Sequence, residues 1–339
     1  MNTDFSFLEF IILTFDLLGI QYDLIICFYE FPYYIDKPGG IDSLNHKVEV
    51  DNGYESKGSF NLTYISEVKG TLPLIVYAAI NPNWDVVPKS ESNIGTLDYN
   101  SLLQRERIQM MESYNNAIRY AYEKAGKKVE TSKDNIYISY IFEGYDHDFE
   151  VGDQIIEVDG QEITLYSELN SLVSSKRTGD KSTVKVLHNG KEYNRTVSFK
   201  YYEEEQRTIM GVSLIVVPEL ETNPTYVFHY DKQEYGPSGG LMISLSVYNQ
   251  LVKEDITGGK TIAGTGTLDE NGKVGRIGGI EYKLKGAVNG GADIFFVPPG
   301  ENYEDAVALK KKRHYKIEIV KVETFDEALN YLEENVIKK

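Results

Sequence analysis

The pattern of hydrophobic and polar residues changes several times along the 339-residue chain. Residues 135–141 alternate between apolar and polar positions, which indicates a half-buried strand, and residues 41–95 are also predicted to form strands. A nearly continuous apolar run at 241–248 indicates a buried helix, and residues 99–126 are predicted to form a long one. The sequence therefore predicts a mixed α/β (α+β) protein with more than one packed unit.

The N-terminal segment is the most apolar part of the chain. Phe5–Tyr29 is long enough to cross a bilayer, which takes about 20 residues. Acidic residues recur within it every seven positions, so a helix would carry one acidic stripe: Glu9, Asp16 and Asp23. Carboxylates are costly inside a membrane. We expect residues 1–32 to form an apolar helix that acts as a membrane anchor, with an interfacial or protein-packed helix as the alternative.

A serine and a lysine in glycine-rich surroundings are the best candidates for catalysis. Ser238 lies in Gly-Pro-Ser-Gly-Gly at 236–240, and Lys283 follows forty-five residues later. A serine hydroxyl needs a neighbouring base to become nucleophilic, and no histidine stands in a comparable setting. A lysine base must be neutral, and deprotonating an ordinary lysine of pKa ~10.4 costs about 4.6 kcal/mol at pH 7. We therefore expect Lys283 to project from a helix start into a dry cleft that lowers its pKa.

The residues around Ser238 suit the same chemistry. An oxyanion hole needs backbone N–H groups close to the reacting carbonyl, and Gly236, Pro237 and Gly239 surround Ser238 without bulky side chains. The helix predicted at 241–248 would turn its positive N-terminal end toward the developing negative charge. Taken alone, this motif favours an ordinary glycine-rich turn before a core helix.

Further motifs follow in a fixed order and spacing. They are Ile-Ala-Gly-Thr-Gly-Thr at 262–267, Gly-Lys-Val-Gly-Arg-Ile-Gly-Gly-Ile at 272–280, and Val-Pro-Pro at 297–299. Together with the serine and lysine motifs, they resemble the proteolytic domain of the Lon family over about residues 205–339.

The resemblance implies a role for each matching residue. Ser238 is the implied nucleophile and Lys283 the general base of a Ser-Lys dyad. Thr265 takes the place of the threonine that hydrogen-bonds the lysine, with Thr267 as the less favoured substitute. Gly239 stands where many Lon-type enzymes have alanine, a small change that is not expected to obstruct the site.

The ATPase half of a Lon machine has no counterpart in the sequence. The closest approach to a Gly-x-x-x-x-Gly-Lys-Ser/Thr loop is Gly259-Lys260-Thr261, but Glu254 stands where the first glycine is required. We therefore expect ATP-independent action on peptide or unfolded-protein substrates.

Residues 128–200 have the features of a second compact unit. Val-Gly-Asp-x-Ile-x-x-Val-Asp-Gly at 151–160 resembles a PDZ domain, and residues 167–172 would form the helix beside its peptide groove, near Leu169 and Leu172. A PDZ domain binds an extended peptide as an added strand at a sheet edge. The alternative is a β-rich spacer that only positions the protease.

The two units together resemble the PDZ-containing, Lon-like serine proteases that bacteria anchor on the outer face of the membrane. That resemblance implies that the early strands pack with the protease and that the PDZ domain is an insertion. The expected units are an apolar helix at 1–32, strands and a linking helix at 33–127, a PDZ domain at 128–200 and a proteolytic domain at 205–339.

Composition limits the partners and cofactors. A net charge of −17 argues against nucleic acid as a partner. Cys27 is the only cysteine, and the five histidines lack ligand spacing, so we expect no metal and no cofactor.

The sequence thus predicts a membrane-anchored, ATP-independent serine endopeptidase that cleaves exported peptides, with its PDZ domain selecting or positioning the substrate. The alternative is a catalytically silent PDZ peptide-binding scaffold on a Lon-type fold. The family implies a single-pass protein of the cell membrane with an extracellular catalytic domain. No Lys or Arg precedes Lys37, so the positive-inside rule does not support that orientation. Assembly into a homo-oligomer is left open.

Overall fold

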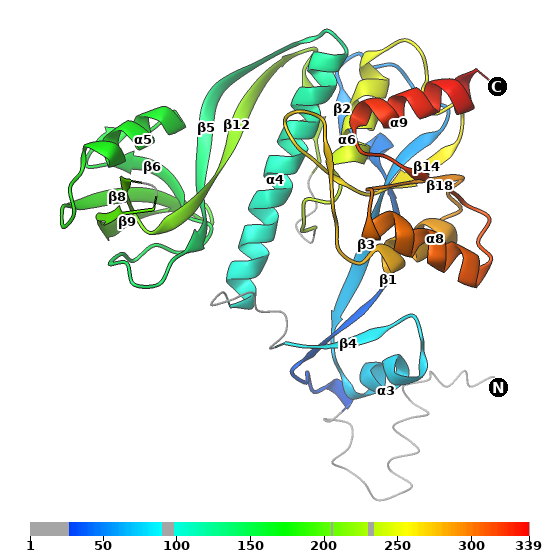
Figure 1. Cartoon of the computed structure of the whole chain (residues 1–339), viewed down its shortest axis with the longest axis horizontal. Coiled ribbons are helices and arrows are strands. Elements are labelled where there is room, and N and C mark those ends of the chain that lie inside the picture. The colour runs from blue at the N-terminus through cyan, green and yellow to red at the C-terminus, as the bar shows by residue number, and fades with distance from the viewer. Residues whose placement is uncertain (1–26, 90–97, 205, 230–233, 339) are drawn as a thin grey trace, which may run out of the picture.

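The computed structural model describes residues 27–89, 98–204, 206–229 and 234–338. Figure 1 shows a larger body, a smaller lobe on the left, and an arm that extends downward from the body. Most of the predicted apolar helix at 1–32 lies outside the described residues. Within the described ranges, no helix is both long enough and apolar enough to span a membrane.

The larger body is built on a six-stranded mixed sheet in the order β18-β17-β14-β3-β1-β4. Neighbours from β18 to β3 are parallel, and β3, β1 and β4 are antiparallel. The strands are β1 (Tyr33–Ser43), β3 (Ser59–Lys69), β4 (Asp85–Pro88), β14 (Thr261–Gly264), β17 (Ile294–Val297) and β18 (Glu318–Lys321). Because β3 pairs with β14, the early strands share one sheet with the C-terminal part of the chain, as expected, and the lobe is inserted between them.

Helices cover both faces of this sheet because its central strands are apolar on both sides. In β17, Ile294 and Phe296 belong to one core cluster, whereas Phe295 and Val297 belong to the other. The helices on the first face are α4 (Tyr99–Lys124), α6 (Gly240–Leu251) and α9 (Phe325–Leu332), which is followed by a π-helical turn (Glu333–Ile337). Those on the second face are α7 (Ile280–Asn289) and α8 (Glu301–Arg313). The helices predicted at 99–126 and 241–248 are α4 and α6.

The smaller lobe has its own sheet, in the order β12-β5-β6-β8-β9, with β7 beside β6. Its elements are β5 (Lys128–Ile141), β6 (Gln154–Val158), β7 (Gln161–Glu162), α5 (Tyr166–Ser175), β8 (Lys181–His188), β9 (Lys191–Ser198) and β12 (Val212–Asn223). A short hairpin of β10 (Lys200–Tyr202) and β11 (Arg207–Ile209) precedes β12. Residues 205–339 were expected to form the proteolytic domain, yet β12 pairs with β5 along its whole length and completes the sheet of the lobe.

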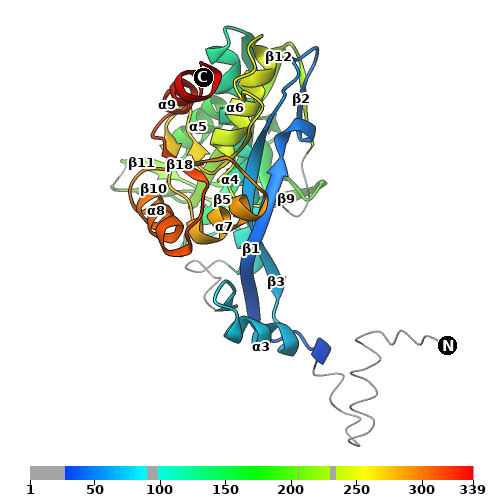
Figure 2. The ribbon, with the colours of Figure 1, turned by 90° about the vertical axis from the view of Figure 1, so that its right-hand side faces the viewer.

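The arm contains the clearest difference from the predicted secondary structure. Residues 41–95 were expected to be strands, but Leu72–Ile80 forms helix α3 at the far end of the arm (Figure 2). Pro73 lies in the first helical turn, where its missing N–H costs nothing, and Ala78 and Ala79 favour helix over strand. The remaining short elements are a 3-10 turn (Leu44–His46), β2 (Val48–Val50) paired with β13 (Tyr226–Phe228), and β15 (Thr267–Leu268) paired with β16 (Val274–Gly275).

Candidate active site

Three separate segments bring the predicted dyad together. Lys283 Nζ lies 2.7 Å from Ser238 Oγ and 3.2 Å from Thr265 Oγ1. Ser238 comes from the turn before α6, Thr265 from the loop after β14, and Lys283 from the first turn of α7. Thr265 Oγ1 also donates a hydrogen bond to the carbonyl oxygen of Ser238, at 3.2 Å. The threonine therefore links the two candidate catalytic residues.

The turn that presents Ser238 depends on its glycines. Gly236 has a φ of +93°, a left-handed conformation that side chains disfavour, and Gly239 is the N-cap of α6. Ser238 is half-buried, so its hydroxyl is accessible at the start of an otherwise buried helix. The first N–H groups of such a helix have no intrahelical acceptor, which makes them suitable donors to an oxyanion.

The loop after β14 holds this turn in place through its backbone. Gly266 N–H donates to the carbonyl of Ser238 at 2.8 Å, and Leu241 N–H donates to the carbonyl of Gly266 at 3.1 Å. A side chain at Gly266 would not fit, because its Cβ would lie 2.5 Å from Val274 Cγ1. Thr267, the less favoured candidate, lies in β15 opposite Gly275 instead of contacting the lysine.

Burial of Lys283 lowers its pKa, as a lysine base requires. Its side chain is only 5% exposed, and desolvation lowers its pKa to about 8. Its position in the first turn of α7, next to the positive end of the helix, disfavours the charged form further. A pKa near 8 leaves about one-tenth of the lysine neutral at pH 7 and reduces the cost of deprotonation to about 1.4 kcal/mol.

Helix α4 holds the turn that carries Ser238, a contact that was not predicted from the sequence. Ser113 Oγ donates a hydrogen bond to the carbonyl of Pro237 at 2.8 Å. A Cβ on Gly239 would lie 3.0 Å from Tyr114 Oη, and one on Gly240 would lie 2.6 Å from Ser113 Oγ. No motif marks Ser113, since it stands more than a hundred residues before the serine and reaches it only through the packing of α4 on α6.

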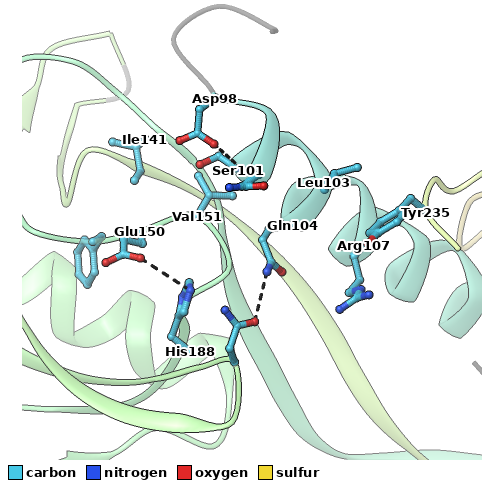
Figure 3. Close-up of a pocket in the computed structure, with 13 residues that line it drawn as sticks. Asp98, Ser101, Leu103, Gln104, Arg107, Ile141, Glu150, Val151, His188 and Tyr235 are labelled. Carbon is cyan, nitrogen blue, oxygen red and sulfur yellow. Dashed lines mark hydrogen bonds and ion pairs between the residues drawn. The ribbon is translucent and has the colours of Figure 1, made fainter. Parts of the chain in front are cut away.

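A pocket of about 670 Å³ lies between the N-terminal half of α4 and the lobe (Figure 3). Tyr235, three residues before the nucleophile, forms one end of its lining, and the guanidinium of Arg107 stacks 5.3 Å from the centre of that ring. Gln104 Nε2 donates to Asn189 Oδ1 across the gap at 3.3 Å. The pocket therefore connects the lobe with the segment that carries Ser238.

One edge of the lobe's sheet is formed by β12 and the other by β9; near Pro218, β12 accepts a hydrogen bond from Asn115 of α4. Leu172 of α5 and Val212 and Leu214 of β12 are half-buried and pack against the core of the lobe. Leu169, expected beside the groove, is instead 1% exposed within that core, because it points from α5 toward the sheet. An apolar surface next to an unpaired strand edge is the arrangement that accepts an extended peptide.

A buried ion-pair network lies in the lobe at the turn of the Val-Gly-Asp motif. Asp153 is fully buried and accepts hydrogen bonds from Arg195 Nε at 3.0 Å and from the Glu150 N–H at 2.9 Å, with His188 Nδ1 at 2.8 Å. His188, one of the five histidines, belongs to this network. In the part of the chain that the structure describes, no group of His, Cys, Asp or Glu is placed to hold a metal ion.

Comparison with known families agrees with both units. Residues 232–334 match the Lon protease (S16) C-terminal proteolytic domain, and residues 126–199 match the PDZ domain. The chain therefore combines a region similar to the Lon proteolytic domain with a region similar to a PDZ domain. The PDZ match ends before β12, so the strand that completes the sheet lies outside the matched region.

Individual relatives of this Lon-type chain match parts of it. An archaeal Lon protease of Archaeoglobus fulgidus is 26% identical over 223 residues, which cover 63% of this chain and 32% of that protein. Lon protease 2 of Bacillus subtilis is 36% identical over 95 residues, which cover 28% of this chain and 16% of that protein. The chain thus spans a third or less of the length of these relatives. The PDZ domain of an SdrC-like protein from Listeria monocytogenes, a solved structure, is 20% identical over 25% of this chain and 93% of that chain, with a TM-score of 0.23.

Proposed function

We propose that this chain is an ATP-independent serine endopeptidase that cleaves peptides or flexible protein segments with a Ser238–Lys283 dyad. The observation that carries the proposal is the 2.7 Å approach of a buried lysine, with a pKa of about 8, to a serine hydroxyl at a helix start. The Lon-type match over 232–334 supports the same reaction class. ATP independence rests on the absence of a phosphate-binding loop from the sequence.

In the proposed reaction, neutral Lys283 Nζ takes the proton of Ser238 Oγ as that oxygen attacks the peptide carbonyl carbon. N–H groups at the start of α6, other than that of Leu241, which donates to Gly266, would stabilise the oxyanion. The protonated lysine then gives its proton to the departing amine nitrogen, which leaves an acyl-enzyme on Ser238. Water, deprotonated by Lys283, attacks the acyl carbon, and Lys283 returns the proton to Ser238 Oγ as the ester bond breaks and the new carboxyl terminus leaves.

We further propose that the PDZ domain holds the substrate as an extended strand on the open edge of β12. Leu172, Val212 and Leu214 would contact its side chains. The pocket that reaches from the lobe to Tyr235 gives the substrate a route toward Ser238.

Attachment to the cell membrane through residues 1–32, with an extracellular catalytic domain, remains a proposal that rests on the apolar sequence of Phe5–Tyr29 and on the family resemblance. Exported peptides would be the substrates in that location.

The full chain is expected to cleave unstructured peptides without ATP, and kcat/KM should rise with pH through about 8. The value of kcat/KM should increase with pH because Lys283 acts as a base only after it loses its proton, and burial lowers its pKa to about 8. Products are identified by mass spectrometry between pH 6 and 10, and a serine-reactive phosphonate should modify Ser238. Peptide binding with neither turnover nor labelling would instead favour the silent PDZ scaffold.

Leu172→Glu is expected to raise KM for long peptides about tenfold, because a charge would replace an apolar contact beside β12 at a cost of about 1.4 kcal/mol. Hydrolysis of short peptides that do not reach the groove should be unchanged. Ser174→Glu, an exposed position two residues away on α5, is the matched control. Equal KM values for long peptides in the two variants would show that the groove beside β12 does not bind the substrate.

A further inference from the structure

Helix α3 exposes an apolar stripe where a surface helix ordinarily has polar residues. Its sequence, Leu-Pro-Leu-Ile-Val-Tyr-Ala-Ala-Ile, contains no charged residue. Leu72, Val76 and Ile80 are 39%, 56% and 77% exposed, and their spacing of four residues places them along one side of the helix. Only Ala78 is buried in the protein. Leu74 and Ile75 are half-buried, so the helix packs one apolar side on the arm and turns a second apolar side outward, where an amphipathic helix ordinarily has polar residues.

The apolar surface continues onto the first described residues of the chain. Phe28 and Tyr29 are exposed, and Phe31 N–H donates to the Gly70 carbonyl at 2.9 Å, directly before α3. Figures 1 and 2 both place α3 at the far end of the arm, away from the larger body. We call this surface the tip patch; it comprises Phe28, Tyr29, Leu72, Val76, Tyr77 and Ile80.

Three observations indicate what covers the tip patch. Three of the six large aliphatic side chains that are exposed in the described part of the chain belong to α3, so the exposure is concentrated. The chain continues from this end into 26 further residues, most of which belong to the apolar segment Phe5–Tyr29. Aromatic rings adjoin the patch, because Trp84 packs edge-on against Tyr77 at 4.7 Å. Tryptophan and tyrosine beside aliphatic side chains are typical of the membrane–water interface.

The charges near the tip patch and on the whole chain indicate which lipid headgroups it would accept. Lys37 Nζ lies 5.0 Å from the centre of the Trp84 ring, but the arm strands also carry Asp36, Glu67 and Asp85 at paired positions. The whole chain has a net charge of −17 and would be repelled by an anionic surface. The uncharged stripe on α3 instead suits a bilayer without net charge.

We propose that the tip patch docks on the surface of a zwitterionic lipid bilayer, with α3 lying in the interface. Leu72, Val76 and Ile80 would enter the boundary between headgroups and acyl chains. With nine residues, α3 is too short to cross a bilayer, so this contact is distinct from any anchor formed by residues 1–32. The contact would hold the far end of the arm at the membrane and the Ser238 site away from it. It does not depend on peptidase activity.

Trp84 is the only tryptophan in the chain, so its fluorescence reports on the tip patch alone. The full chain is reconstituted into phosphatidylcholine vesicles with or without brominated phosphatidylcholine, which quenches tryptophan within the bilayer. Wild-type emission should shift to the blue and be quenched. Val76→Asp/Ile80→Asp should lose most of the quenching. Val227→Asp, at a 55% exposed valine of β13 on the larger body, is the matched control and should keep it.

Absence of quenching in the wild type, or equal quenching in wild type and Val76→Asp/Ile80→Asp, would overturn the proposal. Crosslinking between copies through the patch without lipid quenching would also overturn it, in favour of a second copy of the chain as the partner. Circular dichroism confirms that the variants fold. Cleavage of a soluble peptide, measured in parallel, separates failure of this proposal from failure of the proposed peptidase.

Discussion

Lys283→Met is expected to abolish peptide cleavage and, at the same time, to stabilise the fold at pH 7. Loss of a general base alone costs about 10²–10⁴-fold. Ser238→Ala removes the nucleophile and should also abolish cleavage. Each variant is compared with wild type by mass spectrometry of the products.

The stability gain follows from the pKa of the buried lysine. Its pKa is about 8 in the folded protein and near ~10.4 in the unfolded chain. Below pH 8 the folded protein bears the full cost of burying a charge, up to about 3 kcal/mol, and methionine removes that cost. Between pH 8 and 10.4 the unfolded chain binds more protons, so the wild type gains stability as pH rises.

Thermal or denaturant unfolding at pH 7 and pH 10 measures how the stability difference between Lys283→Met and wild type changes with pH. Lys283→Met should exceed wild type in unfolding free energy at pH 7, and the difference should shrink at pH 10. Ser238→Ala, which retains the lysine, is the matched control and should show no comparable pH-dependent gain. Full cleavage by Lys283→Met would exclude the dyad. A variant that is inactive but less stable than wild type at pH 7 would mean that Lys283 is buried as part of a satisfied structural network.

Gly240→Ala is expected to lower kcat about a hundredfold, although alanine usually favours a helix. Its Cβ would lie 2.6 Å from Ser113 Oγ and 2.7 Å from the backbone nitrogen of Leu268. The contact with backbone cannot be relieved by a side-chain rotation, so the start of α6 must move. A displacement of about 1 Å at a nucleophile is enough for a loss of about 10²-fold.

Gly278→Ala provides the matched control for that substitution. Gly278 lies in the loop before α7, and a Cβ there would meet no atom within 4 Å. Its kcat should stay close to wild type, and both variants should be measured on the same short peptide. Wild-type activity in Gly240→Ala would show that the turn before α6 tolerates the shift and that its close packing does not position Ser238.

Local sequence was sufficient for much of the secondary structure. The nearly continuous apolar run at 241–248 predicted α6, and the long segment at 99–126 predicted α4, whose length exceeds that of an ordinary strand. The prediction failed for α3, where an uncharged run without periodicity fits a buried strand as well as a helix. The prediction also did not assign β12 to the sheet of the lobe, because pairing between strands far apart in sequence cannot be recognised from the residues of either strand.

The sequence by itself determined the order of the Lon-type and PDZ motifs and the identity of the candidate serine, lysine and threonine, because these depend on residue types and spacing. Only the tertiary structure decided that Lys283 Nζ lies 2.7 Å from Ser238 Oγ, that burial lowers the lysine pKa to about 8, and that Ser113 supports the turn. Those properties arise from desolvation and distance between segments that are remote along the chain. The pattern of residues within one segment predicted a lowered lysine pKa but fixed neither the extent of burial nor the distance to Ser238.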